Sequence, residues 1–347
     1  MKRDIRIDLI KFIAIVSVIG LHFFLNNNFS NELMINHKYY LYLLINNIFL
    51  VCVPLFIIST GYLMCNKKEF NIDYISKLFK RIIVPYIIIG FICILFRLYY
   101  VHDIGTYISI ILEIFNFSSC PYAWYIGMYI GLYLFIPFIN KCLDNLNKKD
   151  LIILLILLFI FGPLGSILRI IYHGTHYLLI TSYFYSFWIL NYYIIGYYIK
   201  KYGISIKLKY ILLLILLIPI ISLGNYLLDI LFYNKYYYSG DLNFWGGIIP
   251  YIGSVLVFIL IINMKIDIKN KIVYKFIVST SNYTLNIYLF SYIYDQLIYK
   301  LFPLGVSNSI MYMPLIVLIV FMLSYNSSLI IDYLFYKLLR LMKINNN

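Results

Sequence analysis

The sequence predicts an all-helical protein that crosses a membrane several times. Of the 347 residues, 63% are hydrophobic and only 12% are charged, whereas soluble domains carry about 25% charged residues. The apolar residues gather in runs that are long enough to span a bilayer, which takes about 20 residues each. Because no repeat, linker or shift in composition divides the chain, residues 1–347 are expected to form a single integral-membrane domain without a soluble part.

Ten apolar segments are expected to be membrane-spanning helices. In chain order they are residues 7–25, 40–64, 82–101, 122–140, 151–170, 177–199, 210–231, 244–264, 276–298 and 310–334. Tyr and Phe are frequent near their ends, as in the aromatic belts of membrane proteins. The first segment is expected to be retained, because its apolar run is long and no small-residue cleavage site follows it.

The distribution of basic residues supports an even number of spans. If both termini are cytoplasmic, 22 of the 28 Lys and Arg residues fall in links on that side and five on the other, and Lys11 lies within the first segment. Lys and Arg resist translocation, so this asymmetry predicts that both termini are cytoplasmic. It also accounts for the formal charge of +14 without a nucleic-acid partner.

The cysteines predict neither a metal site nor a disulfide framework. The five cysteines are scattered without metal-ligand spacing, and only Cys120 falls in a predicted outside loop. The many Ile, Asn, Tyr and Lys residues are typical of an AT-rich bacterial genome. The expected location is therefore the plasma membrane of a bacterium, with lipid as the surrounding partner and the oligomeric state undetermined.

The first helix carries ionisable residues inside an apolar run, namely Asp8, Lys11 and His22. Such residues require partners or a function in a membrane. Lys11 and His22 lie about 16 Å apart along a helix, and eleven steps of about 100° return them to nearly the same face. Asp8 lies one turn from Lys11. The three residues therefore predict a polar stripe that faces an interior space.

Five short motifs are spread over nearly the whole chain. They are DLIKFIA at residues 8–14, with ten residues between Lys11 and His22, VPLFIISTGYLM at 53–64, RIIVPY at 81–86, AWYIGMYI at 123–130 and SNYTLNIYLF at 281–290. In this order they resemble the motifs of the acyltransferase 3 family of integral-membrane acyltransferases. Two positions depart from the pattern. Many members carry a basic residue where this chain has Leu78, and a histidine where it has Ser291.

The resemblance implies a membrane O-acyltransferase. It would move an acyl group, expected to be acetyl, from cytoplasmic acyl-coenzyme A to a hydroxyl of a cell-surface or lipid-linked glycan, with acyl-coenzyme A as a co-substrate and no permanently bound cofactor or metal. His22 is the expected catalytic residue, since an imidazole can take the hydroxyl proton or accept the acyl group transiently. The alternative is a structural histidine whose ring is bonded to a neighbouring carbonyl.

Basic residues at the inner side are expected to bind the donor. Lys11 would neutralise its phosphates and Asp8 would orient Lys11 through an ion pair, although a lysine that snorkels to the interface would look the same. Arg81, with Lys77 and Lys80, would hold the phosphates of the nucleotide part. The alternative for these three residues is a positive-inside cluster without a ligand.

Residues toward the outer face are candidates for acceptor binding. Trp124 and Tyr125 would stack on a sugar or, alternatively, anchor the fourth helix at the interface. The remaining outer candidates are Arg97, Arg169, His173 and His176. Near the ninth segment lies a group of polar residues that helix packing alone explains: Ser279, Thr280, Ser281, Asn282, Asn286 and Ser291.

Other functions remain open from sequence alone. The same family fold would serve an O-succinyltransferase or an enzyme that acylates a small hydroxylated metabolite. A transporter for a glycan precursor or an amino acid would use the same polar cavity, but transporters commonly show internal repeats, and none is visible here.

Overall fold

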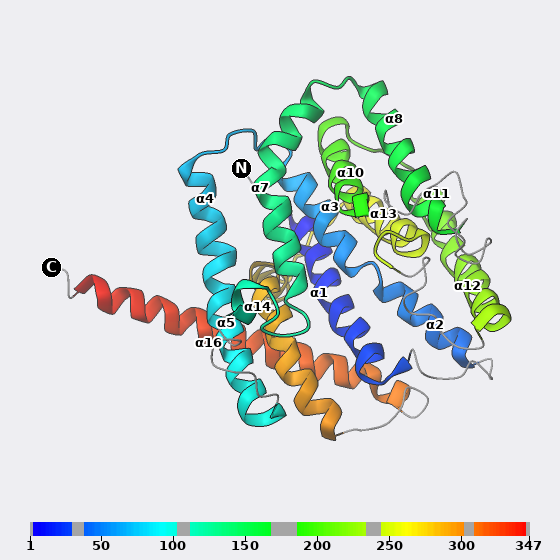
Figure 1. Ribbon diagram of the computed structural model, residues 1–347. Coiled ribbons are helices and arrows are strands. Elements are labelled where there is room, and N and C mark those ends of the chain that lie inside the picture. Colours follow the sequence, from blue (N-terminus) through cyan, green and yellow to red (C-terminus); the bar gives the residue numbers. More distant parts are fainter. Residues whose placement is uncertain are drawn as a thin grey trace.

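The computed structural model describes residues 3–29, 38–102, 112–167, 186–233, 244–301 and 309–344, and these residues form helices and links without a strand (Figure 1). The predicted all-helical class is thus confirmed. Six of the described helical segments are long and apolar enough to cross a membrane: Ile5–Asn26, Lys38–Met64, Ile72–Val101, Trp124–Asp144, Lys148–Ile167 and Ile310–Leu334. The count of ten spans and the cytoplasmic placement of both termini stay predictions.

The other predicted spans also contain helices. They are α10 (Trp188–Tyr202), α11 (Leu208–Ile215), α12 (Leu217–Tyr233), α13 (Ile248–Asn263) and α14 (Lys271–Leu301). Within its described residues α10 is short, and α14 is long but contains a run of hydroxyl and amide side chains around residues 279–286.

Prolines interrupt two of the long segments. The second segment divides into α2 (Lys38–Phe49) and α3 (Cys52–Met64) just before Pro54, which cannot donate a backbone hydrogen bond. The third segment runs through α4 (Ile72–Leu78), a π-turn η2 (Phe79–Ile83), α5 (Val84–Phe96) and a second π-turn η3 (Arg97–Val101). Pro85 leaves the carbonyl of Arg81 without its α-helical donor, and the wider η2 turn forms at this place.

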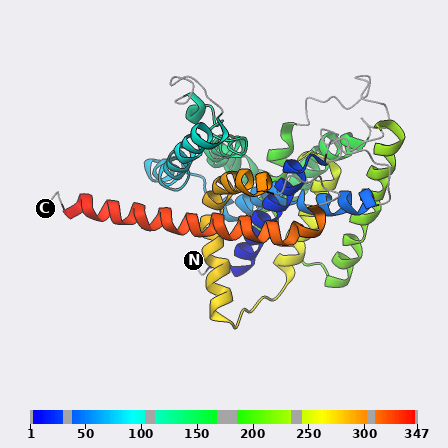
Figure 2. The same cartoon turned by 90° about the horizontal axis from the view of Figure 1, so that it is seen from below.

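Helix α1 (Ile5–Asn26) lies at the centre of the bundle. It packs against α14, α3, α2, α13 and α16 (Met313–Ile344), and α7 (Trp124–Asp144) and α8 (Lys148–Phe159) lie farther out (Figure 1). The C-terminal part of α16 projects away from the other helices, as Figure 2 shows. This central position explains how α1 accommodates polar residues, because most of its surface faces protein rather than lipid.

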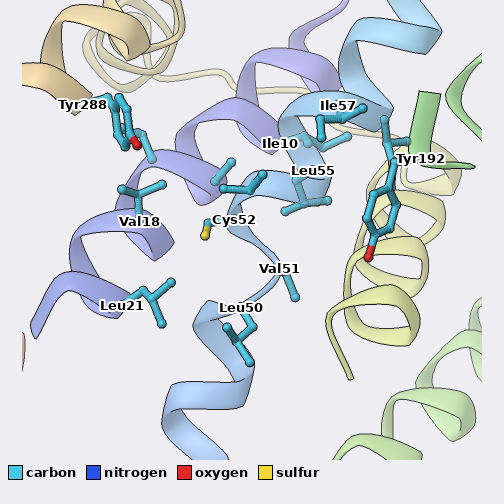
Figure 3. Close-up of a cluster of buried hydrophobic side chains, with 14 of the residues drawn as sticks. Ile10, Val18, Leu21, Leu50, Val51, Cys52, Leu55, Ile57, Tyr192 and Tyr288 are labelled. Atoms are coloured by element: carbon cyan, nitrogen blue, oxygen red, sulfur yellow. The ribbon is translucent and has the colours of Figure 1, made fainter. Parts of the chain in front are cut away.

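The core beside α1 is built from apolar side chains of several helices. Val18 and Leu21 of α1 face Cys52 and Leu55 of α3 (Figure 3). On the far side of α3, a Cβ at Gly61 would collide with the Tyr193 carbonyl of α10, and one at Gly196 with the Ile58 carbonyl. The two glycines therefore permit the close α3–α10 contact, as small residues do in membrane helix pairs.

Several charged contacts gather the helix ends into one end of the bundle, which we call the basic end. Asp144 at the end of α7 pairs with Lys68, beyond α3, at 2.5 Å and with Lys201 of α10 at 2.9 Å. Arg6 donates to the Ile262 carbonyl of α13 at 2.7 Å. Asp4 caps α1 and pairs with Arg6, which lowers the pKa of the Asp4 carboxyl.

Candidate active site

A cavity of about 580 Å³ opens at the basic end between α1, α3, the α4–α5 segment, α7 and α14. Its wall has a basic part, an aromatic part and a part with hydroxyl and amide groups. The basic residues are Lys11, Lys67, Lys77 and Arg81; the aromatic ones are Phe56, Tyr125, Tyr129, Tyr133 and Tyr288; the hydroxyl and amide residues are Thr60, Ser281, Asn282 and Thr284.

The four cations of the cavity form no ion pair within the described part of the chain. Neither a hydrogen bond nor an ion pair joins any of them to the described part of the chain, and no carboxylate lies among the lining residues there. Lys11 is half-buried and the other three are exposed. Unpaired cations around a concave space favour an anionic ligand, and the fork of an Arg side chain is well matched to phosphate.

The predicted ion pair between Asp8 and Lys11 is wrong. Asp8 instead accepts two hydrogen bonds from Arg3, from Nε to Oδ2 and from Nη2 to Oδ1, both 2.7 Å long. The guanidinium fork offers two parallel donors to a carboxylate, whereas an ammonium offers one point of charge. Lys11 itself does line the cavity, as the donor-binding prediction requires.

His22 is buried inside the bundle and does not face lipid. Its side chain is 7% exposed, and Nδ1 lies 3.3 Å from Oδ2 of Asp295, a fully buried residue of α14. The two atoms are within ion-pair distance but are not aligned for a hydrogen bond, and Nδ1 and Asp295 Oδ1 have no hydrogen-bond partner among the described residues. A carboxylate beside an imidazole can orient the ring, as the aspartate does in a Ser-His-Asp triad.

Tyr122 completes the surroundings of His22. Its ring stacks on the imidazole with centroids 3.6 Å apart and an interplanar angle of 23°. Its hydroxyl donates to Asp295 Oδ2 at 2.8 Å and accepts from Asn26 Nδ2 at 3.1 Å. The link before α7 thus fixes both the His22 ring and the Asp295 carboxylate. No hydrogen bond from the described residues reaches His22 Nε2.

Tyr288 separates His22 from the cavity. Tyr288 lines the cavity and its ring centroid lies 6.2 Å from that of His22, whereas His22 itself is not a lining residue. The Tyr288 hydroxyl donates to the Tyr122 carbonyl at 2.5 Å. Val18, one helical turn before His22, also lines the cavity. The cavity therefore ends one aromatic ring away from the imidazole.

The structure divides the other predicted binding residues. Arg81, Lys77 and Tyr125 line the cavity, but Lys80 does not. Trp124 lies outside the cavity as well. The residue is 40% exposed, and its ring stacks with Trp245 at a centroid distance of 6.3 Å. Only part of the sequence-predicted set is therefore brought together.

Further predicted residues have other roles or lie elsewhere. Arg97 pairs with Glu113 at 2.6 Å, which occupies the guanidinium that was expected to bind an acceptor. Ser291 donates to the Tyr288 carbonyl at 2.7 Å within α14, so it makes a local helix contact. Arg169, His173 and His176 lie outside the described residues.

Sequence reasoning missed several residues of the site, among them Asp295, Tyr122 and Lys67. A signal for Asp295 was present, since a carboxylate inside a predicted span is a functional candidate by default. Tyr122 gave no such signal because Tyr is abundant throughout the chain. Lys67 was indistinguishable from the other basic residues of its link.

These features define a helical membrane protein in which a buried histidine and carboxylate lie beyond a cavity with a basic mouth. The chain belongs to the acyltransferase 3 family, because the family model, described as an acyltransferase domain, matches residues 4–330. This confirms the resemblance predicted from the five motifs and identifies a multi-pass membrane protein of an acyltransferase family. Neither the curated proteins nor the solved structures contain a match.

Proposed function

We propose that the protein is a membrane O-acyltransferase that transfers an acetyl group from cytoplasmic acetyl-coenzyme A to a hydroxyl of a cell-surface or lipid-linked glycan. The observation that carries the proposal is the His22–Asp295 pair, which is buried one aromatic ring beyond a cavity with four unpaired cations. The family match supports acyl transfer. The acetyl group, the coenzyme A donor and the glycan acceptor are the specific parts of the proposal.

In the proposed reaction, His22 acts as the general base. Nε2 takes the proton of the acceptor hydroxyl, whose oxygen attacks the thioester carbonyl carbon. The C–S bond then breaks, the acyl group stays on the acceptor as an ester, and the leaving thiolate receives the proton from the imidazolium to give the free thiol. Asp295 stabilises the imidazolium, and Tyr122 holds both side chains in place.

The cavity is proposed to bind the donor. The coenzyme A phosphates would contact Lys67, Lys77 and Arg81 at the mouth, and Lys11 would contact the anionic part that reaches deeper. The pantetheine arm would lie along the tyrosine-lined wall. Tyr288 would have to move aside for the thioester to approach His22, since Tyr288 lines the cavity and its ring centroid lies 6.2 Å from that of His22.

The function is tested on the surface glycans of the source cells. Glycans from cells with the gene, without it, and complemented with wild type or His22→Ala are analysed by mass spectrometry for esters. The expected result is an acetyl ester that requires both the gene and His22. A succinyl ester would change the acyl group in the proposal, and an ester on a small metabolite would change the acceptor. Substrate flux without consumption of an acyl donor would contradict it.

A further inference from the structure

Arg3 connects the start of α1 to the wall of the cavity. Besides its two bonds to Asp8, Nη2 of Arg3 donates to Asn282 Oδ1 at 2.9 Å and to the Val278 carbonyl at 3.3 Å. Asn282 is a cavity-lining residue of α14. The Arg3 guanidinium therefore binds Asp8, the only carboxylate within α1 (Ile5–Asn26), and lies next to the proposed donor site.

Asp8 has a second cation within reach. Its side chain is 6% exposed, and Lys11 lies three residues later on the same helix, where side chains are neighbours. The charges of Asp8, Arg3 and Arg81 act electrostatically on Lys11. A buried carboxylate without a partner is costly, so Asp8 would pair with Lys11 if Arg3 were absent.

We propose that Arg3 is a positioning residue for the ligand of the cavity. By occupying both oxygens of Asp8, Arg3 keeps the Lys11 ammonium available to an anionic ligand. This inference rests on the proposed function in one respect, namely that the natural ligand is the phosphate-bearing part of an acyl donor. Arg3 acts through Asp8 and Lys11 and touches neither the thioester nor the acceptor.

The proposal predicts a specific pattern of loss and rescue. In Arg3→Gln, Asp8 turns to Lys11 and cancels its charge, which weakens anion binding. In the double variant Arg3→Gln/Asp8→Asn the competing carboxylate is gone, so Lys11 is available again. A merely structural role of Arg3 would give no rescue, because the contacts to Asn282 and Val278 are lost in both variants.

The test measures binding of two probes, coenzyme A and inorganic pyrophosphate, to the purified full-length protein in lipid nanodiscs. Arg3→Gln is expected to raise both dissociation constants about tenfold, equivalent to about 1.4 kcal/mol. The double variant is expected to return to within about twofold of wild type. Arg6→Gln is the matched control, because Arg6 lies at the same end of α1 but pairs with Asp4. The Arg6→Gln variant should therefore bind both probes with nearly wild-type affinity.

Two further variants make the result decisive. Arg3→Lys keeps the charge but loses the fork, and intermediate affinity is expected. In a Lys11→Met background, Arg3→Gln should cause no additional loss. The inference would be overturned by any of three results: Arg3→Gln binds the probes with wild-type affinity, the double variant binds them as weakly as Arg3→Gln, or wild type binds neither probe. Wild type that binds the probes but transfers no acyl group would instead contradict the proposed function alone.

Discussion

The two ends of the polar stripe on α1 differ in what surrounds their ionisable groups. Lys11 faces a cavity and forms no ion pair with the described residues, whereas His22 is enclosed by Asp295 and Tyr122. A group without a protein partner is placed to bind a ligand, and a group fixed by protein partners is placed to perform chemistry. The comparison predicts that substitutions at the first end change KM and those at the second change kcat.

The largest expected effect is at His22. His22→Ala removes the proposed base, and kcat is expected to fall by about 10³-fold, because general base catalysis contributes about 10²–10⁴-fold. Acetyl transfer by purified protein is measured under saturating donor. The exposed His102 provides the control, since His102→Ala should retain wild-type kcat. If the His22→Ala variant still transfers acetyl groups, His22 is not the catalytic base.

A smaller loss of kcat is expected from Asp295→Asn. The amide keeps the size of the side chain but cannot stabilise the imidazolium, and misorientation of the ring is expected to cost about 10²-fold. KM for the donor should change little, because Asp295 is not a cavity residue. Asp332→Asn is the matched control, since Asp332 accepts a hydrogen bond from Tyr283 between α14 and α16, away from His22. Equal effects of the two substitutions would count against a specific role of Asp295.

At the cavity end, Arg81→Gln is expected to raise KM for acyl-coenzyme A about tenfold with little change in kcat, because a hydrogen bond to a charged group contributes about 1.5 kcal/mol. The neighbouring Lys80 supplies the control. Lys80→Gln removes the same charge from the same basic cluster but from outside the cavity wall, so KM should stay near the wild-type value. If both variants raise KM equally, general surface charge rather than the cavity binds the donor.

The smallest effect is expected at a cation that has a protein partner. Lys201→Met breaks the ion pair with Asp144, which keeps Lys68 as its other partner. Such partly exposed pairs contribute about 0–1 kcal/mol, so a small decrease in thermal stability is expected. Steady-state kinetics should give an unchanged KM. A rise in KM as large as that of Arg81→Gln would erase the distinction between paired and unpaired cations.

The sequence predicted the class of fold and the residues whose chemistry is costly in a membrane. Asp8, Lys11 and His22 stood out because they interrupt an apolar run; Asp8 and His22 are buried in the protein and Lys11 lines the cavity. The family motifs located Arg81, which lines the cavity. These residues could be singled out from sequence because burial of ionisable groups in a bilayer is expensive whatever the tertiary structure.

The pairing of these residues could not be predicted in the same way. Helical spacing placed Asp8 beside Lys11, but Arg3 folds back from before the helix and binds Asp8 more favourably. Lys80 and Arg81 are adjacent in sequence and both lie in the η2 turn, but only Arg81 lines the cavity. Contacts between distant segments, such as Tyr122 with Asp295, leave no local pattern.

The most direct test of the account is a single-turnover experiment with radiolabelled acetyl-coenzyme A, purified protein and surface glycan from cells that lack the gene. Wild type and His22→Ala are compared for coenzyme A binding and for ester formation in the same samples. The account predicts that both proteins bind coenzyme A with similar affinity and that only wild type forms the ester. Ester formation by His22→Ala at the wild-type rate would contradict the account.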